Sequence, residues 1–234
     1  MNLRQRRRVN PVPASWRVGK PVRVKISIVD KLKYMELDRL MKPLDSAIKI
    51  QEFLDSIPYN TTKRTLSPLL VMKERMAHCM DGGLFAAAAL RRLGYPPLIV
   101  DLTAENDDDH IIAVFREGGC WGAVAKSNTT VLRFREPVYR TLRELAMSYF
   151  DMYYNLNGQK SLRSYSRTID LSRFDDRNWE TTEEDLEYIG DYTYTVRHYP
   201  LITPSQVKKL SNVPKYLYNA GFAGADIDGL YKPV

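Results

Sequence analysis

The chain has 234 residues and a net charge of +7 at pH 7, and 44% of its residues are hydrophobic and 27% charged. This is the composition of an ordinary globular protein, and it excludes collagen-like and wholly disordered chains. No run of about 18 apolar residues occurs and no apolar stretch follows the basic start, so we expect neither a transmembrane helix nor a secretory signal. Two cysteines, Cys79 and Cys120, are too few for a disulfide framework. We therefore expect a reducing, cytoplasmic location.

Charge and periodicity predict three parts of the chain. Residues 1–20 are basic and carry prolines, so we expect an N-terminal arm. Residues 21–157 hold the periodic apolar segments of a core. Residues 158–234 form an acidic, tyrosine-rich extension, in which nine acidic residues fall between positions 170 and 191. Because its tyrosines alternate with acids and not with arginines, this extension favours packing or protein binding over nucleic-acid binding.

The first half of the chain predicts one strand followed by three helices. Residues 22–30 alternate apolar and polar positions, the period of a half-buried strand. Residues 44–57 and 67–76 show helical spacing, the second with a serine–proline start that suits a helix N-terminus. Residues 79–93 are alanine-rich and predict a buried helix, ended by Gly94.

Two glycines lie in the first turns of this buried helix. Gly82 and Gly83 are poor helix formers, so their presence there needs a reason other than helix propensity. We expect them to permit the close approach of another part of the chain.

A strand and a hairpin follow the buried helix. Residues 98–102 predict a strand and residues 103–109 a loop. Two strand-like runs, 110–117 and 120–127, are separated by Gly118-Gly119, a strong signal for a two-residue hairpin turn.

The remainder predicts less regular structure. Residues 130–135 are expected to extend the sheet, and a helix is expected from Pro137 to Met152. Residues 158–191 are expected to be irregular, residues 192–199 to form a late strand, and residues 204–210 a short helix. The order of these elements predicts an α+β fold with a mostly antiparallel sheet.

Cys79 and His110 are the residues whose placement points to chemistry. Cys79 is the first residue of the predicted buried helix, where free N–H groups and the positive end of the dipole favour a thiolate. His110 begins the strand after the loop. A cysteine at a helix start facing a histidine at a strand start is the arrangement of a nucleophile and its base.

Two residues are candidates for the group that orients His110. If Gly118 and Gly119 are the turn residues, the hairpin register places His110 opposite Ser127 on one face of the sheet. Asn128 is one residue further and needs a bulge to reach that face. Either side chain would hold the imidazole in the required tautomer, and the choice stays open.

Several segments together resemble the transglutaminase-like superfamily. They are Ala77-His78-Cys79-Met80-Asp81, the helix ending Leu90-Arg91-Arg92-Leu93-Gly94-Tyr95-Pro96-Pro97, the strand Leu98–Leu102, and then His110 and Trp121. The resemblance covers about residues 45–130. It implies a papain-like fold with a Cys–His–Asp triad, Cys79 as nucleophile and His110 as base, and acyl chemistry on amides.

The chain departs from that pattern at the acid. The aspartate of the superfamily would fall at Ala125, which Lys126, Ser127 and Asn128 follow. A papain-type asparagine in the third position keeps Asn128 a candidate. Two functions are therefore expected as alternatives. One is transglutaminase-like, protease-like or deamidase-like acyl transfer or hydrolysis through a Cys79 thioester. The other is a catalytically inactive module that binds a peptide or protein.

Further residues and segments are candidates for a site, and most have a plainer structural interpretation. His78 is an alternative partner for the thiolate, and Cys120 is read as structural. The run Asp107-Asp108-Asp109-His110 is read as a solvated acidic loop, because consecutive carboxylates point in different directions and do not wrap a metal ion. No phosphate-binding or dinucleotide motif occurs, so no cofactor is expected. Nucleic-acid binding through the basic arm is the weakest hypothesis.

The oxyanion of such a reaction needs two donors. The backbone N–H of Cys79 is one, and the sequence does not place the second. The acidic segment 170–191 is expected to cover the cleft or to present a partner surface.

Overall fold

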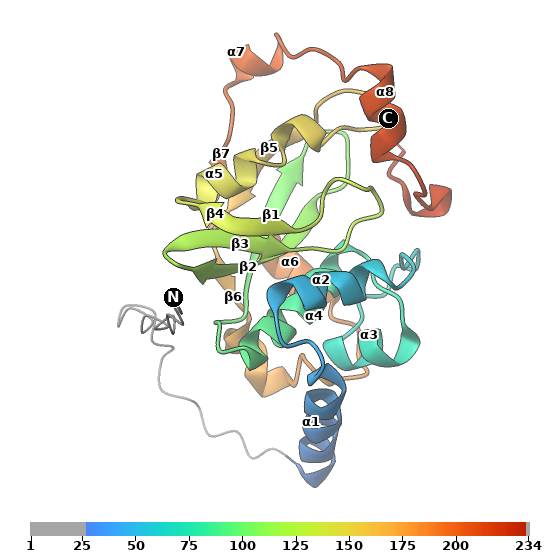
Figure 1. Cartoon of the computed structure of the whole chain (residues 1–234), viewed down its shortest axis with the longest axis vertical. Helices are drawn as coiled ribbons and strands as arrows, with labels where there is room; N and C mark the ends of the chain where they lie inside the picture. The colour runs from blue at the N-terminus through green and yellow to red at the C-terminus, as the bar shows by residue number, and fades with distance from the viewer. Residues whose placement is uncertain (1–26, 233–234) are drawn as a thin grey trace, which may run out of the picture.

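The computed structural model describes residues 27–232. Four helices come first in this part of the chain, and the strands of a sheet follow together with the later helices (Figure 1). The first helices are α1 (Ile28–Met41), α2 (Ala47–Asp55), α3 (Pro68–Glu74) and α4 (Cys79–Arg92). The strands are β1 (Leu98–Ala104), β2 (His110–Glu117), β3 (Cys120–Val124), β4 (Arg135–Tyr139), β5 (Leu162–Ser166), β6 (Ile169–Asp170) and β7 (His198–Pro200). The later helices are α5 (Leu142–Met147), α6 (Glu187–Thr195), α7 (Pro204–Val207) and α8 (Lys215–Gly221), with 3-10 segments at Phe150–Met152, Leu171–Arg177 and Ile227–Gly229.

The strands form one antiparallel sheet, so the fold is α+β as predicted. Its order is β4-β3-β2-β1-β5-β7, and β6 also pairs with β1. The last strands come from the region expected to be an extension, yet β5 pairs directly with β1. The expected boundary between residues 157 and 158 thus falls between strands of one sheet.

Both faces of the sheet are covered, and neighbouring residues of the central strands enter different cores. Ile99 and Ile111 pack into the cluster that surrounds α4. Leu98 and Ile112 pack into a second cluster with residues of α5. Because both faces are buried, residues 98–100 of β1 are apolar in succession and do not alternate with polar residues.

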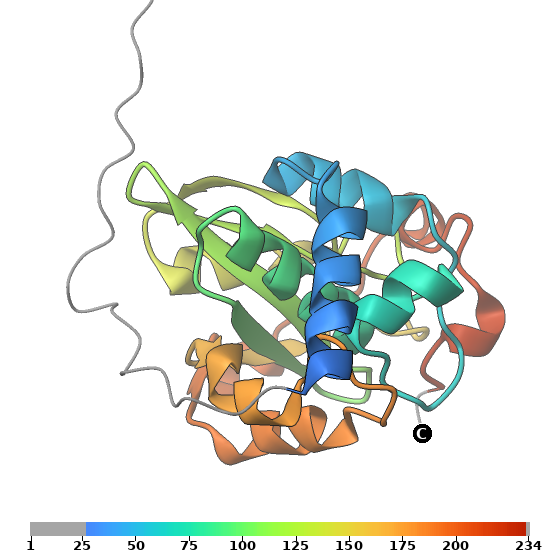
Figure 2. The ribbon, with the colours of Figure 1, turned by 90° about the horizontal axis from the view of Figure 1, so that it is seen from below.

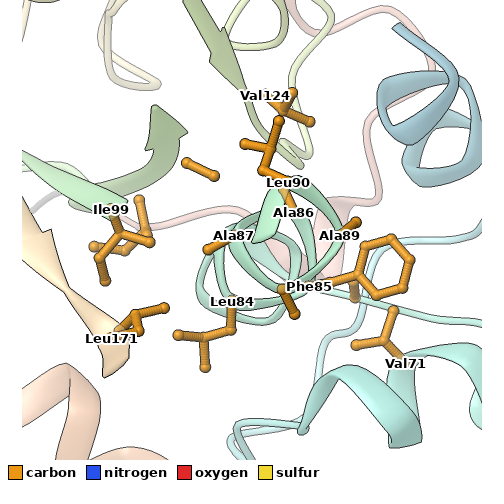
Figure 3. Close-up of a cluster of buried hydrophobic side chains, with 14 of the residues drawn as sticks. Val71, Leu84, Phe85, Ala86, Ala87, Ala89, Leu90, Ile99, Val124 and Leu171 are labelled. Atoms are coloured by element: carbon orange, nitrogen blue, oxygen red, sulfur yellow. The ribbon is translucent and has the colours of Figure 1, made fainter. Parts of the chain in front are cut away.

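Helix α4 lies at the centre of the first cluster, and the other early helices gather on its side of the sheet (Figure 2). Figure 3 shows its side chains directed outward in several directions, with Phe85 toward Val71 of α3 and Leu84 toward Leu171. A helix that is apolar all round is a buried helix, as its sequence predicts.

Gly82 and Gly83 bring α4 against the sheet. A Cβ on Gly82 would collide with Cβ of Lys126, and a Cβ on Gly83 would come within 2.5 Å of Cγ2 of Ile111. The expected close approach is therefore confirmed.

The helices around residues 44–57, 67–76 and 79–93 are also confirmed, as is the hairpin. Ser67 caps α3 through its hydroxyl, which accepts a hydrogen bond from the Leu70 N–H. The hairpin register pairs Ala113 with Val124, as the two-glycine turn predicts.

The strand predicted at 22–30 is wrong at residues 28–30. Ser27 caps α1 by accepting a hydrogen bond from the Asp30 N–H, so residues 28–30 are helical. This local cap outweighs the alternating apolar pattern. Residues 22–26 and the predicted arm at 1–20 lie outside the described residues.

The predictions for the second half need more correction. Pro137 lies inside strand β4, and the helix begins only after Thr141, whose capping box with Glu144 sets its start. Residues 130–134 are not a strand, whereas the region 158–191 contains β5 and β6. The strand predicted at 192–199 is largely wrong, because α6 runs to Thr195 and β7 begins at His198. The helix predicted at 204–210 is shorter, Pro204–Val207.

Within residues 27–232, no helix combines the length and the apolar character that crossing a membrane requires.

Gly82→Ala tests the close approach of α4. We expect this overpacking change to lower the free energy of unfolding by about 1–3 kcal/mol, because the backbone beside Lys126 must shift. Gly190→Ala is the matched control, since Gly190 lies in α6 and a Cβ there would meet only Cε of Met80 at 3.4 Å. It should be neutral or stabilising by up to about 1 kcal/mol. Urea unfolding of both variants makes the comparison, and equal stability would contradict the tight approach.

Candidate active site

The four site residues named from the sequence line one cavity. Cys79, His110, Ser127 and Asn128 all contribute to its wall, although they come from α4, β2 and the segment after β3. Its volume is about 60 Å³. That is room for a few water molecules, since one water needs about 10–15 Å³ on this measure.

The rest of the wall is aromatic, acidic and apolar. It consists of Tyr59, Asp107, Asp108, Asp109, Thr129, Val131, Leu132, Met152, Tyr153, Tyr154, Leu156, Phe222, Gly229, Leu230 and Tyr231. The contributing residues are spread from position 59 to position 231, so only the folded chain assembles this wall.

His78 caps the helix that begins at Cys79. Its Nδ1 accepts hydrogen bonds from the N–H groups of Met80 at 3.1 Å and Asp81 at 3.3 Å. Because Nδ1 accepts, the ring proton lies on Nε2, which is 3.4 Å from Oδ1 of Asp81. The imidazole of His78 therefore serves the helix start, and the alternative in which it partners the thiolate finds no contact to support it.

Asp81 ties the helix start to the loop before α3. Its fully buried carboxylate accepts hydrogen bonds from the Leu66 N–H at 2.7 Å, from Nδ2 of Asn60 at 2.9 Å and from the His78 N–H at 2.9 Å. Burial raises the pKa of this carboxyl, against the opposing effects of His78 and these hydrogen bonds.

Tyr59 is a site residue that the sequence did not reveal. It pairs with Ala77 in a parallel bridge, which places it beside the start of α4. Burial raises its pKa well above the usual value, and a hydrogen bond with the Cys79 backbone acts in the opposite direction. The Tyr59 hydroxyl therefore lies beside the Cys79 backbone. A single tyrosine in a loop between two helices carries no periodic signal by which it could have been found.

Cys79 holds a proton in this site. Burial raises the pKa of its thiol from 9.0 to about 12, although the N–H groups of Ile111 and Met80 favour the thiolate. The charges of Asp108 and Asp81 add to the rise. Its Sγ lies 3.8 Å from the Asp109 carbonyl oxygen, to which it donates. The expectation of a lowered thiol pKa is therefore wrong for this arrangement, because desolvation outweighs the helix dipole.

His110 is neutral in the same site. Burial lowers its pKa from 6.5 to about 4, and the positive charges of Arg135 and Arg133 contribute. The carboxylate of Asp109, the residue before His110, accepts from the Ala104 N–H through Oδ1. The His110 Nε2 lies 2.9 Å from the Leu132 carbonyl oxygen. A carbonyl only accepts, so Nε2 carries the proton and Nδ1 keeps its lone pair.

Neither Ser127 nor Asn128 orients His110. The hairpin ladder ends at Val124, so the register that would set Ser127 opposite His110 does not continue that far. The Ser127 hydroxyl lies 3.0 Å from both the backbone N–H and the hydroxyl of Thr129. The side chain of Asn128 is bonded to the backbone of Asp226. The Leu132 carbonyl takes the orienting position instead.

The position that the resemblance reserves for an acid is built into the core. The backbone N–H and C=O of Ala125 are paired with the side-chain amide of Gln51 at 3.0 and 2.9 Å. The Lys126 ammonium donates to the carbonyl oxygens of Leu54 at 2.8 Å and Ile57 at 2.5 Å, at the end of α2. Burial lowers the pKa of Lys126 to about 8. This stretch supports helix packing and contributes no carboxylate.

In the described part of the chain, no group of three or more histidine, cysteine or acidic side chains is arranged to hold a metal ion. The acidic loop binds its own surroundings: Asp107 accepts from the Ser161 hydroxyl and Asp109 from the Ala104 N–H.

Comparison with protein-family models found no match, and comparison with curated proteins found none either.

Asp81→Asn tests the hydrogen-bonded helix start. An amide turned to accept from Leu66 must point its NH₂ at the N–H donors of Asn60 and His78. We expect the free energy of unfolding to fall by about 2–3 kcal/mol, because buried donors then lose their acceptor. Asp176→Asn, at an exposed acid, is the control and should change stability by less than about 0.5 kcal/mol. Similar unfolding midpoints for the two variants would contradict the role of Asp81.

His110 predicts a pH dependence of stability. Its folded pKa of about 4 lies below the ordinary value of 6.5, so between these values the unfolded chain binds the extra proton. Stability contributed by the neutral ring is present above about pH 6.5 and is lost as the pH falls to 4, by up to about 3 kcal/mol. The measurement is urea unfolding at pH 7.0 and 4.5 for the natural chain and for His110→Gln. The other titrating groups remain in both proteins, so the free energy of unfolding should fall less between pH 7.0 and 4.5 in the variant. Equal falls in the two proteins would contradict a buried neutral His110.

Proposed function

We propose that the chain is a transglutaminase-like protein with a papain-like core, which carries out cysteine-dependent acyl transfer or hydrolysis on a peptide or protein amide. The observation that supports this most is the meeting of Cys79, at the head of α4, and His110, at the head of β2, in one cavity. We place the protein in a reducing compartment, as in the cytoplasm, because both cysteines are free.

The proposed reaction begins with the neutral pair. His110 Nδ1, which keeps its lone pair, takes the proton of the Cys79 thiol as Sγ attacks the amide carbonyl. The tetrahedral intermediate collapses to a thioester when the C–N bond breaks, and the same nitrogen returns the proton to the leaving amine. Water or a second amine then attacks the thioester, with His110 again acting as the base. The Leu132 carbonyl, bonded to Nε2, holds the ring in the required tautomer in place of an acid.

Two donors are available to the oxyanion of that intermediate. The backbone N–H of Cys79 is the first. The Tyr59 hydroxyl, which lies beside the Cys79 backbone, is the second and fills the role that the sequence left open. The carbonyl oxygen of the substrate would replace the Tyr59 oxygen at the Cys79 N–H, and the Tyr59 hydroxyl would turn to donate to it.

A binding module without catalysis is the second candidate. The raised pKa of Cys79 and the lowered pKa of His110 favour it, since both groups are neutral at pH 7. Such a module would bind a peptide or protein partner through the same cavity.

Amine incorporation tests the catalytic proposal. Carboxamide-bearing proteins are incubated with a fluorescent primary amine, and both labelling and ammonia release are measured. We expect Cys79→Ala to reduce both by at least about 10³-fold, because the covalent step is lost. Cys120→Ala is the matched control and should leave both rates within about twofold, since this cysteine lies in the hairpin away from the cavity wall.

Full turnover by Cys79→Ala would reject the catalytic proposal. Retention of a peptide complex by a natural chain that shows neither ammonia release nor amine incorporation would support the binding module instead.

A further inference from the structure

A late segment of the chain covers the cavity. Phe222, Gly229, Leu230 and Tyr231 belong to its wall together with Cys79 and His110. This covering segment, residues 222–231, follows α8 and is drawn in red in Figure 1. With the segment in place the cavity measures about 60 Å³.

Asn128 holds the covering segment by its main chain. The Asn128 Nδ2 donates to the Asp226 carbonyl oxygen at 2.7 Å, and the Asp226 N–H donates to Oδ1 of Asn128 at 2.8 Å. One side-chain amide thus satisfies both polar groups of a single backbone residue, as a neighbouring strand does in a sheet. Asp226 has extended backbone angles, φ −75° and ψ 117°. This contact recognises a peptide backbone and makes no use of the Asp226 side chain.

Gly229 sets a size limit beside the same amide. A Cβ built on this residue would lie 2.9 Å from Cδ1 of Tyr59 and 3.0 Å from Nδ2 of Asn128. Tyr59 is the residue that the bridge to Ala77 places beside the start of α4. A side chain larger than hydrogen therefore cannot be accommodated here without movement of Tyr59 or Asn128.

The attachment of the covering segment is uneven along its length. Its start is firmly held. The Thr130 N–H donates to the carbonyl oxygen of Gly221, the residue before the segment, at 2.9 Å, and the ring of Phe222, the first residue of the segment, packs edge-on against Tyr154. In the described chain, the hydrogen bonds of residues 227–230 stay within the segment itself. Ile227 is 76% exposed. Residues 226–231 can therefore leave the cavity without disturbing the start of the segment at Phe222.

We propose that the cavity is the closed end of a groove for a polypeptide ligand, that Asn128 binds the ligand's main chain, and that residues 226–231 occupy this groove in its place. The ligand is a peptide segment that is extended at the Asn128 contact and has a glycine three residues later. That this ligand is a substrate rests on the proposed function. The groove itself would bind the ligand whether or not the chain is catalytic.

The first test displaces the covering segment in the full chain. Gly229→Val forces it away from Tyr59 and Asn128, so we expect alkylation of Cys79 by iodoacetamide at pH 8 to become about tenfold faster or more, the change to which 1.4 kcal/mol corresponds. Peptide mass spectrometry separates Cys79 from Cys120, whose rate should not change. Ile227→Ala is the matched control, because it alters an exposed side chain of the same segment and should leave the Cys79 rate as it is.

The second test offers the groove a peptide. A fluorescent peptide with the sequence of residues 222–232 is added to the full-length Gly229→Val variant, and binding is followed by anisotropy and by slower Cys79 alkylation. Two altered peptides should bind at least about tenfold more weakly. One has valine at the Gly229 position, and the other has an N-methyl group on the Asp226 amide, which removes the donor to Asn128. Adding Asn128→Ala to the protein should weaken the unmodified peptide equally.

The outcomes separate this proposal from the reaction. Unchanged Cys79 alkylation in Gly229→Val, no binding of the unmodified peptide, or equal binding of the N-methylated peptide each overturns the groove. If circular dichroism finds Gly229→Val unfolded, Asn128→Ala in the otherwise natural chain replaces it, since it removes both hydrogen bonds without adding atoms, and the same faster alkylation is expected. Peptide binding without amine incorporation would reject the reaction and keep the groove.

Discussion

The buried carboxylate of Asp81 is the constraint on which the site depends. It sits in the first turn of α4 and accepts hydrogen bonds from the Leu66 backbone and the Asn60 side chain as well as from the helix start. The loop that carries Tyr59 is therefore fixed to the helix that begins at Cys79. A buried carboxylate without hydrogen-bond partners would cost free energy. The loop and the helix start therefore stay together, or the helix start is lost.

Desolvation decides the charge state of the site. A helix N-terminus and nearby backbone N–H groups favour a Cys79 thiolate, yet burial raises its pKa to about 12 and lowers that of His110 to about 4. Both effects follow from the same removal of water, part of which residues 222–231 bring about by covering the cavity. The neutral pair and the occupied groove thus belong to one arrangement, and a substrate that replaces residues 226–231 would meet the neutral pair from which the proposed reaction begins.

The third position of the proposed site is held by backbone and not by a side chain. The Leu132 carbonyl bonds Nε2 of His110, while the stretch around Ala125, where an acid was sought, is paired with Gln51 and packed against α2. Asn128 is consequently free of His110 and available to the backbone of Asp226. The Asn128 amide is thereby suited to binding the main chain of a peptide.

Elements with local causes could be predicted from the amino-acid sequence alone. The Ser67 cap and the Gly118-Gly119 turn are set by neighbours within a few residues, so α3 and the hairpin register could be predicted, and the apolar span of α4 indicated a buried helix with Cys79 at its head. Features that depend on residues far apart in the sequence followed only from the folded chain. Ser127 lost its place opposite His110 because the strand ends at Val124, and Tyr59 and Gly229 joined the site from opposite ends of the chain. The pKa values of Cys79 and His110 also belong to this second group, because burial is a property of the assembled fold and leaves no mark on the local sequence.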